Sequence, residues 1–214
     1  MLEKPAEAYA DEKAKELKQA AGGFGITDVL ILPYTDRPLK RTVEIVNHIV
    51  ALVCEVKLDI PITECPAHIA ATRSHSIPND HYTTSAMVTE ALTIAAFPAT
   101  GTNRAAHQVV QVYYLGVDLA YREVDLIVDN PDQYENWVEA ETAIGSLSQS
   151  ADYARKRVET LPGYFGFMPR VSYTEPFVRG SMRLDRRLPV SRLELNRVRE
   201  KPLTRIERQE LKCD

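Results

Sequence analysis

Cysteine is scarce in this sequence, whose 214 residues include only Cys54, Cys65 and Cys213. A small, odd number of cysteines excludes the disulfide framework that holds small secreted domains together, and it favours a reducing compartment. No run of eighteen apolar residues occurs, and the N-terminal segment 2–21 is charged throughout. We therefore expect neither a membrane span nor secretion by a signal peptide, and we place the protein in the cytoplasm or in an assembled virion.

Two common catalytic motifs are also missing. The sequence contains no G-x-x-x-x-G-K-[ST] loop, so a phosphate-binding nucleotide fold is unsupported, and no G-x-S-x-G elbow for a nucleophilic serine. The net charge of −4 argues against a domain that coats nucleic acid, because such domains carry a strong basic excess. Hydrophobic residues make up 44% of the chain, which is enough for a sizeable core.

Charge is divided unevenly along the chain. The C-terminal stretch 179–214 holds eleven Lys or Arg against six Asp or Glu, a net +5, and the remaining residues hold fifteen against twenty-four, a net −9. Pro189 and Pro202 interrupt this basic stretch, so we expect it to be extended or only locally helical. An acidic surface on the same chain or on a neighbouring subunit is its natural partner, and nucleic acid is not.

Between its ends the chain alternates between helical and strand-like patterns. We predict an α+β body, with an α/β fold as the alternative. The expected helices cover 5–21, 38–55, 83–97, 131–144 and 150–161, and the expected strands cover 28–33, 55–63, 109–115 and 117–128. Four segments follow from this pattern: an N-terminal helical extension (1–23), the body (24–161), an aromatic connector (162–178) and the basic arm (179–214).

The Pro-punctuated segment between Cys65 and His81 gathers potential metal ligands. Cys65, His68, His75 and His81 lie within seventeen residues, and a thiolate with three imidazoles can complete a tetrahedral zinc site. If the three histidines bound zinc alone, an open fourth position could activate water, with Asp80 or Glu64 as base. The spacing matches no common zinc finger, so the same residues also fit a buried thiol beside polar loop histidines. Our first expectation is therefore that the protein has no cofactor, with zinc as the alternative.

Aromatic and basic side chains near the C-terminus suggest protein contacts. Aromatic residues on a Pro- and Gly-broken stretch either anchor a connection to a partner or close the domain's own core. Guanidinium groups interleaved with acids suit a protein partner better than a polyanion. The predicted interaction residues are Tyr164, Phe165, Phe167, Arg183, Arg186, Arg187, Arg192, Arg197 and Arg199.

These observations favour a structural role. We predict a non-enzymatic assembly subunit of a large, symmetric complex, such as a bacteriophage virion or tail component, whose terminal extensions bind copies of itself or other subunits. The alternative is a metal-dependent hydrolase that uses the Cys and His residues between positions 65 and 81.

Overall fold

The computed structural model describes residues 6–35, 38–66, 80–99, 104–117, 119–145 and 150–199. Within these ranges, helices surround a four-stranded mixed sheet, which confirms the predicted α+β class for a single domain. The described helices are α1 (Ala6–Gly23), α2 (Val43–Val56), α4 (Asp80–Ala95), α5 (Tyr134–Ala143), α6 (Ala151–Phe167) and α7 (Arg192–Arg199).

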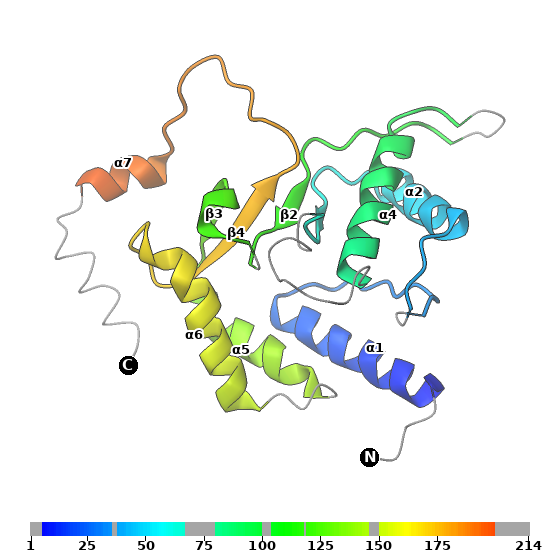
Figure 1. Ribbon diagram of the computed structural model, residues 1–214, viewed down its shortest axis with the longest axis horizontal. Helices are drawn as coiled ribbons and strands as arrows, with labels where there is room; N and C mark the ends of the chain where they lie inside the picture. Colours follow the sequence, from blue (N-terminus) through cyan, green and yellow to red (C-terminus); the bar gives the residue numbers. More distant parts are fainter. Residues whose placement is uncertain are drawn as a thin grey trace.

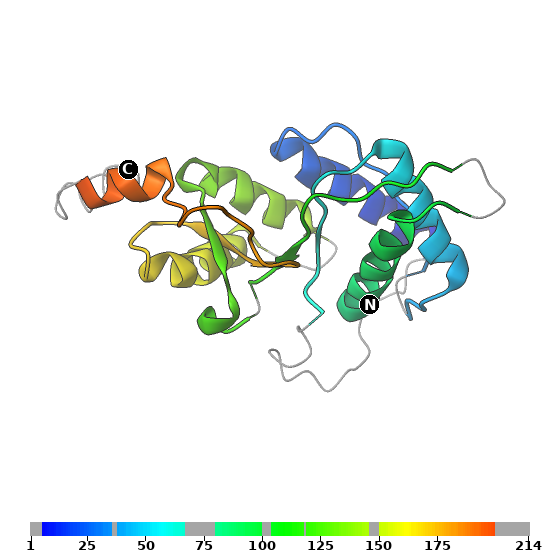
Figure 2. The same cartoon turned by 90° about the horizontal axis from the view of Figure 1, so that it is seen from above.

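The sheet has the strand order β1-β2-β4-β3, with β1 (Ile62–Thr63) parallel to β2 (Tyr113–Leu115). Strand β4 (Thr174–Arg179) runs antiparallel to both β2 and β3 (Leu126–Asp129). Strand β1 lies at an edge of the sheet, the position in which a proline such as Pro61, with no amide hydrogen to donate, is tolerated. The sheet separates the α2–α4 pair from the α5–α6 pair, and α1 packs against α5 (Figures 1 and 2).

Helix α2 shows how packing overrides intrinsic propensity. Its many Val and Ile residues suit a strand, yet buried side chains recur along one helical face and pack against α4. Thr42 caps the helix by accepting a hydrogen bond from the Ile45 amide at 3.3 Å, and Lys57 ends it in the left-handed conformation. The core between the two helices consists of Ile45, Val46, Val50, Val53, Met87, Ala91, Leu92 and Ala95.

Helix α6 begins where the sequence predicts but ends later. The Ser150 hydroxyl accepts a hydrogen bond from the Tyr153 amide at 3.2 Å, as an N-cap residue does. The helix continues through Pro162 to Phe167, six residues past the predicted end. Gly166 permits the chain to reverse there, because a Cβ at this position would lie 2.4 Å from the Val171 carbonyl oxygen. The predicted aromatic connector is thus built as a helix end, a turn and strand β4.

The expected strand at 28–33 does not form. The structure pairs this run with none of its described strands, and Leu30 and Ile31 are 64% and 44% exposed. An apolar run becomes a strand only when a neighbour pairs with its backbone groups, and sequence pattern alone does not supply that neighbour.

The described part of the basic arm leaves β4 and arches away to the short helix α7 (Figure 1). This confirms the expectation of an extended segment with local helix. Met182, Leu184 and Leu188 are each at least 95% exposed. The Arg197 guanidinium donates a hydrogen bond to the Pro169 carbonyl at the end of α6, so α7 contacts the body there. No described helix is long and apolar enough to cross a membrane.

The close approach at Gly166 yields a stability prediction. We expect Gly166→Ala to lower the free energy of unfolding by about 1–3 kcal/mol, because the added methyl forces the turn after α6 to open. At Gly163, in the same helix, a Cβ would meet no atom within 4 Å. Gly163→Ala should raise that free energy by about 0.5–1 kcal/mol. Urea unfolding followed by circular dichroism measures both, and equal midpoints for the two variants would contradict the packing described.

Candidate functional site

The carboxyl ends of the parallel strands β1 and β2 lie side by side at one end of the sheet, called here the carboxyl edge of β1 and β2. The register pairs Thr63 with Tyr114, so Glu64, which follows β1, comes next to Leu115, the last residue of β2. Ligand sites in open sheets form outside the carboxyl ends of parallel strands, where the chain turns away and backbone and side-chain groups become accessible. We therefore expect a functional site at this edge.

A carboxylate and an imidazole meet at this edge. His81 Nδ1 lies 2.9 Å from Glu64 Oε1, and the side chains are 49% and 27% exposed. Glu64 comes from the end of β1 and His81 from the first turn of α4. His81 shares a helix face with the buried residues Ser85 and Leu92, at i+4 and i+11, so it begins the buried face of α4. A carboxylate on Nδ1 orients the imidazole so that Nε2 is the atom that binds a metal or exchanges a proton.

Two of the four predicted metal ligands fall within the described ranges. Cys65 is 4% exposed and directly follows Glu64, and His81 stands in the pair just described. His68 and His75 lie outside the described residues. In the ranges that the structure describes, no three His, Cys, Asp or Glu side chains are grouped so as to hold a metal ion. The zinc site thus stays a prediction.

Ser85 was missed by the sequence analysis. Its side chain is fully buried one turn beyond His81, and among the described residues its Oγ has no hydrogen-bond partner. A buried hydroxyl without a partner costs free energy. Its spacing of four residues from His81 was the available signal, since i and i+4 share a helix face.

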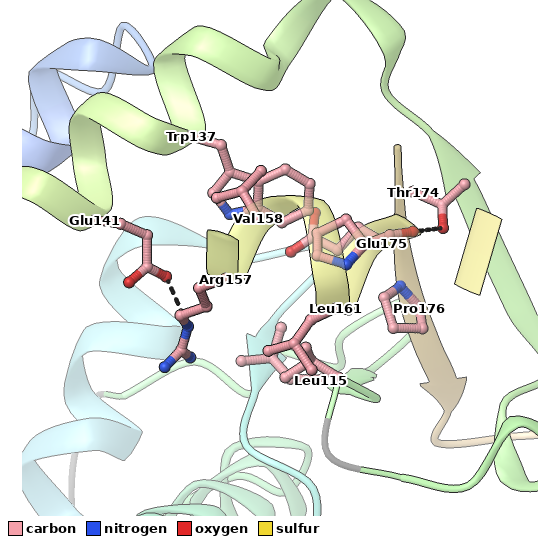
Figure 3. A pocket seen from close by; sticks show the side chains of 11 residues that line it. Leu115, Trp137, Glu141, Arg157, Val158, Leu161, Thr174, Glu175 and Pro176 are labelled. Atoms are coloured by element: carbon pink, nitrogen blue, oxygen red, sulfur yellow. Dashed lines mark hydrogen bonds and ion pairs between the residues drawn. The ribbon is translucent and has the colours of Figure 1, made fainter. Parts of the chain in front are cut away.

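A hollow of about 130 Å³ lies where β2 ends, between β4, α5 and α6. Leu115, Trp137, Leu161 and Pro176 supply apolar walls from these four elements (Figure 3). A second hollow of about 300 Å³ shares Trp137 with the first. A single small ring would fill the first hollow.

Three charged side chains accompany these apolar walls. Glu141 Oε1 accepts an ion-pair contact from Arg157 Nε at 3.3 Å, so these two charges offset one another. Glu175 lines both hollows, and burial raises the pKa of its carboxyl above the ordinary value. Sequence pattern did not reveal Glu175, because its desolvation comes from α5 and α6, which are distant from β4 along the chain.

The predicted interaction residues do not gather at this edge. Phe165 is 1% exposed and its ring stacks on Tyr121 at 6.0 Å, so it packs in the core of this chain, which is one of the two roles expected for these aromatic residues. Tyr164 and Phe167 are exposed. Of the six arginines predicted to make interactions, Arg183 pairs with Asp185 and Arg197 contacts Pro169, while the other four, Arg186, Arg187, Arg192 and Arg199, are exposed.

Three solved structures share this fold. The 4-carboxy-2-hydroxymuconate hydratase GalB from Pseudomonas putida is 13% identical with a TM-score of 0.70, over 88% of this chain and 79% of that protein. The conserved protein TT1542 from Thermus thermophilus is 19% identical with a TM-score of 0.70, over 90% of this chain and 81% of that one. The N,N'-diacetylchitobiose deacetylase from Pyrococcus horikoshii is 18% identical with a TM-score of 0.65, over 81% of this chain and 64% of the deacetylase.

At such low identities these likenesses establish the fold alone. No protein-family model and no curated protein matches the sequence. The fold is nevertheless one that a hydratase and a deacetylase use, and this contradicts the prediction of a non-enzymatic virion or assembly subunit. That prediction was wrong because it took the division of charge, which is a property of surfaces, as a guide to the architecture beneath them.

The partly buried carboxyl of Glu175 makes stability depend on pH. A raised pKa means that the folded state binds the proton more tightly than the unfolded state, so the stability this group contributes is present at low pH and is lost as pH rises through the folded pKa. We expect Glu175→Gln to raise the melting temperature at neutral pH, with the gain vanishing below the ordinary Glu pKa of about 4.3. Thermal melts across this range, with the exposed Glu139→Gln as control, measure it. A less stable Gln variant at neutral pH would mean that a cation holds the carboxylate.

Proposed function

We propose that this protein is an enzyme for which water is a reactant, and specifically a metal-dependent hydrolase acting at the carboxyl edge of β1 and β2. The observation that carries the proposal is the contact between Glu64 and His81, which places an oriented imidazole where strands of this kind present catalytic groups. The names of two proteins that share the fold support it, since a hydratase adds water and a deacetylase uses water to release an acyl group.

Cys65 and His81, with His68 and His75 from the intervening segment, are the proposed metal ligands. A thiolate and imidazoles form a donor set suited to zinc. Cys65 is buried and follows Glu64 in the sequence, and the Glu64 carboxylate contacts the imidazole of His81. A bound zinc ion would lower the pKa of its water to about 7. Glu64 orients His81 in this arrangement, which leaves Asp80, exposed at the start of α4, as the proposed base.

Removing the imidazole should abolish both metal binding and turnover. We expect the unchanged chain to hold about one zinc ion and His81→Ala to lose it, with kcat/KM falling by about 10²-fold or more toward the substrate that the chain turns over. Glu64→Gln should retain the imidazole but cost about 10–100-fold. Metal content by mass spectrometry is read on the same samples as activity toward N,N'-diacetylchitobiose and 4-carboxy-2-hydroxymuconate.

The matched control is His48→Ala, which removes an imidazole that contacts Tyr34 from α2. This variant should keep its zinc and its activity. Zinc retained in full by His81→Ala, or lost equally from His48→Ala, would contradict the metal site whatever the substrate proves to be.

We also infer that the arm binds a second copy of the chain. Three large apolar side chains, Met182, Leu184 and Leu188, stand almost fully exposed among the arm's cations, and single chains seldom leave such a group uncovered. The arm is basic and the rest of the chain acidic, which provides charge complementarity between copies. This inference concerns how an enzyme associates and assigns it no structural role.

Light scattering tests the inference. We expect the full chain to be at least a dimer and a chain ending at Gly180 to be a monomer, with higher salt weakening the full-length association. Replacing Met182, Leu184 and Leu188 together by Ser should have the effect of the truncation, because it removes the apolar contacts and keeps the charges. The same number of chains per particle for all three proteins would overturn the inference.

A further inference from the structure

The hollow at the end of β2 holds a carboxyl group that the proposed hydrolysis does not use. Glu175 lies in β4, half-buried between apolar side chains and the neutral amides of Asn130 and Gln133, and its oxygens make no ion pair with any described side chain. Partial withdrawal of a carboxylate from water without a nearby cation costs free energy, so a carboxylate of this kind in a cavity is a candidate for ligand recognition.

Trp137 stands beside this carboxyl. Both residues line the first hollow (Figure 3), and both also line the second, so they form the wall that the two hollows share. The face of an indole ring attracts cations more strongly than any other aromatic side chain. An aromatic face and an unpaired carboxyl side by side favour a positively charged group, and they favour it over an anion in particular.

The remaining charges at the first hollow do not reverse this preference. The Arg157 guanidinium is already paired with Glu141, at 3.3 Å, so the two together contribute little net charge. The second hollow adds the neutral amides of Asn130 and Gln133 and the ring of Phe24. Glu175 therefore decides the sign of the charge that these hollows accept.

Size limits the apolar part of the ligand. The first hollow is about 130 Å³, and apolar protein cavities of about 150 Å³ bind a molecule as large as benzene. We propose that this pocket binds a small organic ammonium compound, with a single apolar ring between Leu161 and Pro176 and its amine between Glu175 and Trp137. This site is independent of the metal chemistry proposed above, because it involves none of the same residues.

The chain contains a single tryptophan, so its fluorescence reports on this pocket alone. Benzylamine, benzyl alcohol and benzoate share one ring and differ in charge, and each is titrated at neutral pH into the full chain. We expect benzylamine to change the Trp137 emission saturably, with a Kd at least tenfold lower than those of the alcohol and the acid. Free N-acetyltryptophanamide corrects for quenching without binding.

Two variants decide the role of the carboxyl. Glu175→Gln keeps the shape of the side chain, and it should bring the Kd of benzylamine to that of benzyl alcohol. The control Glu139→Gln changes an exposed residue on the same helix as Trp137, and it should leave the Kd values of benzylamine and benzyl alcohol unchanged. Thermal melts establish that each variant is folded. Equal affinity of the unchanged chain for the amine and the alcohol, an amine Kd that Glu175→Gln does not alter, or no saturable response would overturn the proposal.

Discussion

The antiparallel pairing of β2 with β4 is the interaction on which the rest of the structure depends. Only three residue pairs join these strands, yet they connect the part of the sheet beside α2 and α4 to the part beside α5 and α6. A glycine stands at each end of the pairing. A Cβ on Gly116 would lie 3.0 Å from the Pro176 carbonyl oxygen, and one on Gly180 would lie 2.9 Å from Val112 Cβ.

These close approaches permit two further hydrogen bonds that extend the short ladder. The Gly116 amide donates to the Pro176 carbonyl at 2.9 Å, and the Gly180 amide donates to the Val112 carbonyl at 2.8 Å. Each bond contributes about 1 kcal/mol net, which matters for a pairing this short. The same pairing builds the pocket, because Leu115 and Pro176 come from its two strands. The separate register of β1 with β2 places Glu64 next to Leu115.

Local signals in the sequence located most helices. Ser150 and Thr42 cap helices as their residue types predict, and the buried face of α2 follows helical spacing. Long-range pairing was not accessible in the same way. Segment 28–33 has a strand-like composition and remains unpaired among the described strands, whereas only two residues of the strand expected at 55–63 join the sheet. A strand is defined by its neighbour, and the neighbour is set by the whole topology.

The residues of the candidate site also differ in whether local sequence signals or the overall topology reveal them. Cys65 and His81 could be named from the sequence because their side-chain chemistry is distinctive wherever they lie. The contact of Glu64 with His81 requires β1 to end beside the first turn of α4, and the burial of Glu175 requires two helices to cover β4. Neither arrangement has a local signature. Charge division along the chain, in contrast, is fully visible in the sequence and does not distinguish an enzyme from an assembly subunit, since a basic arm can be attached to either fold.

Two polar groups, one buried and one half-buried, lower the stability of the fold. The hydroxyl of Ser85 lies inside the molecule without a hydrogen bond to any described group, and the carboxyl of Glu175 is desolvated among apolar side chains. An Ala and a Gln at these positions would satisfy packing at lower cost, because neither would leave a buried hydroxyl unsatisfied or a carboxylate desolvated. Violations of this kind concentrate at functional sites, where local stability is given up for recognition or chemistry. Ser85 lies one turn behind His81, and Glu175 lines the pocket at the end of β2. Both unfavourable polar groups therefore lie near the carboxyl ends of β1 and β2, where the strand topology also predicts a functional site.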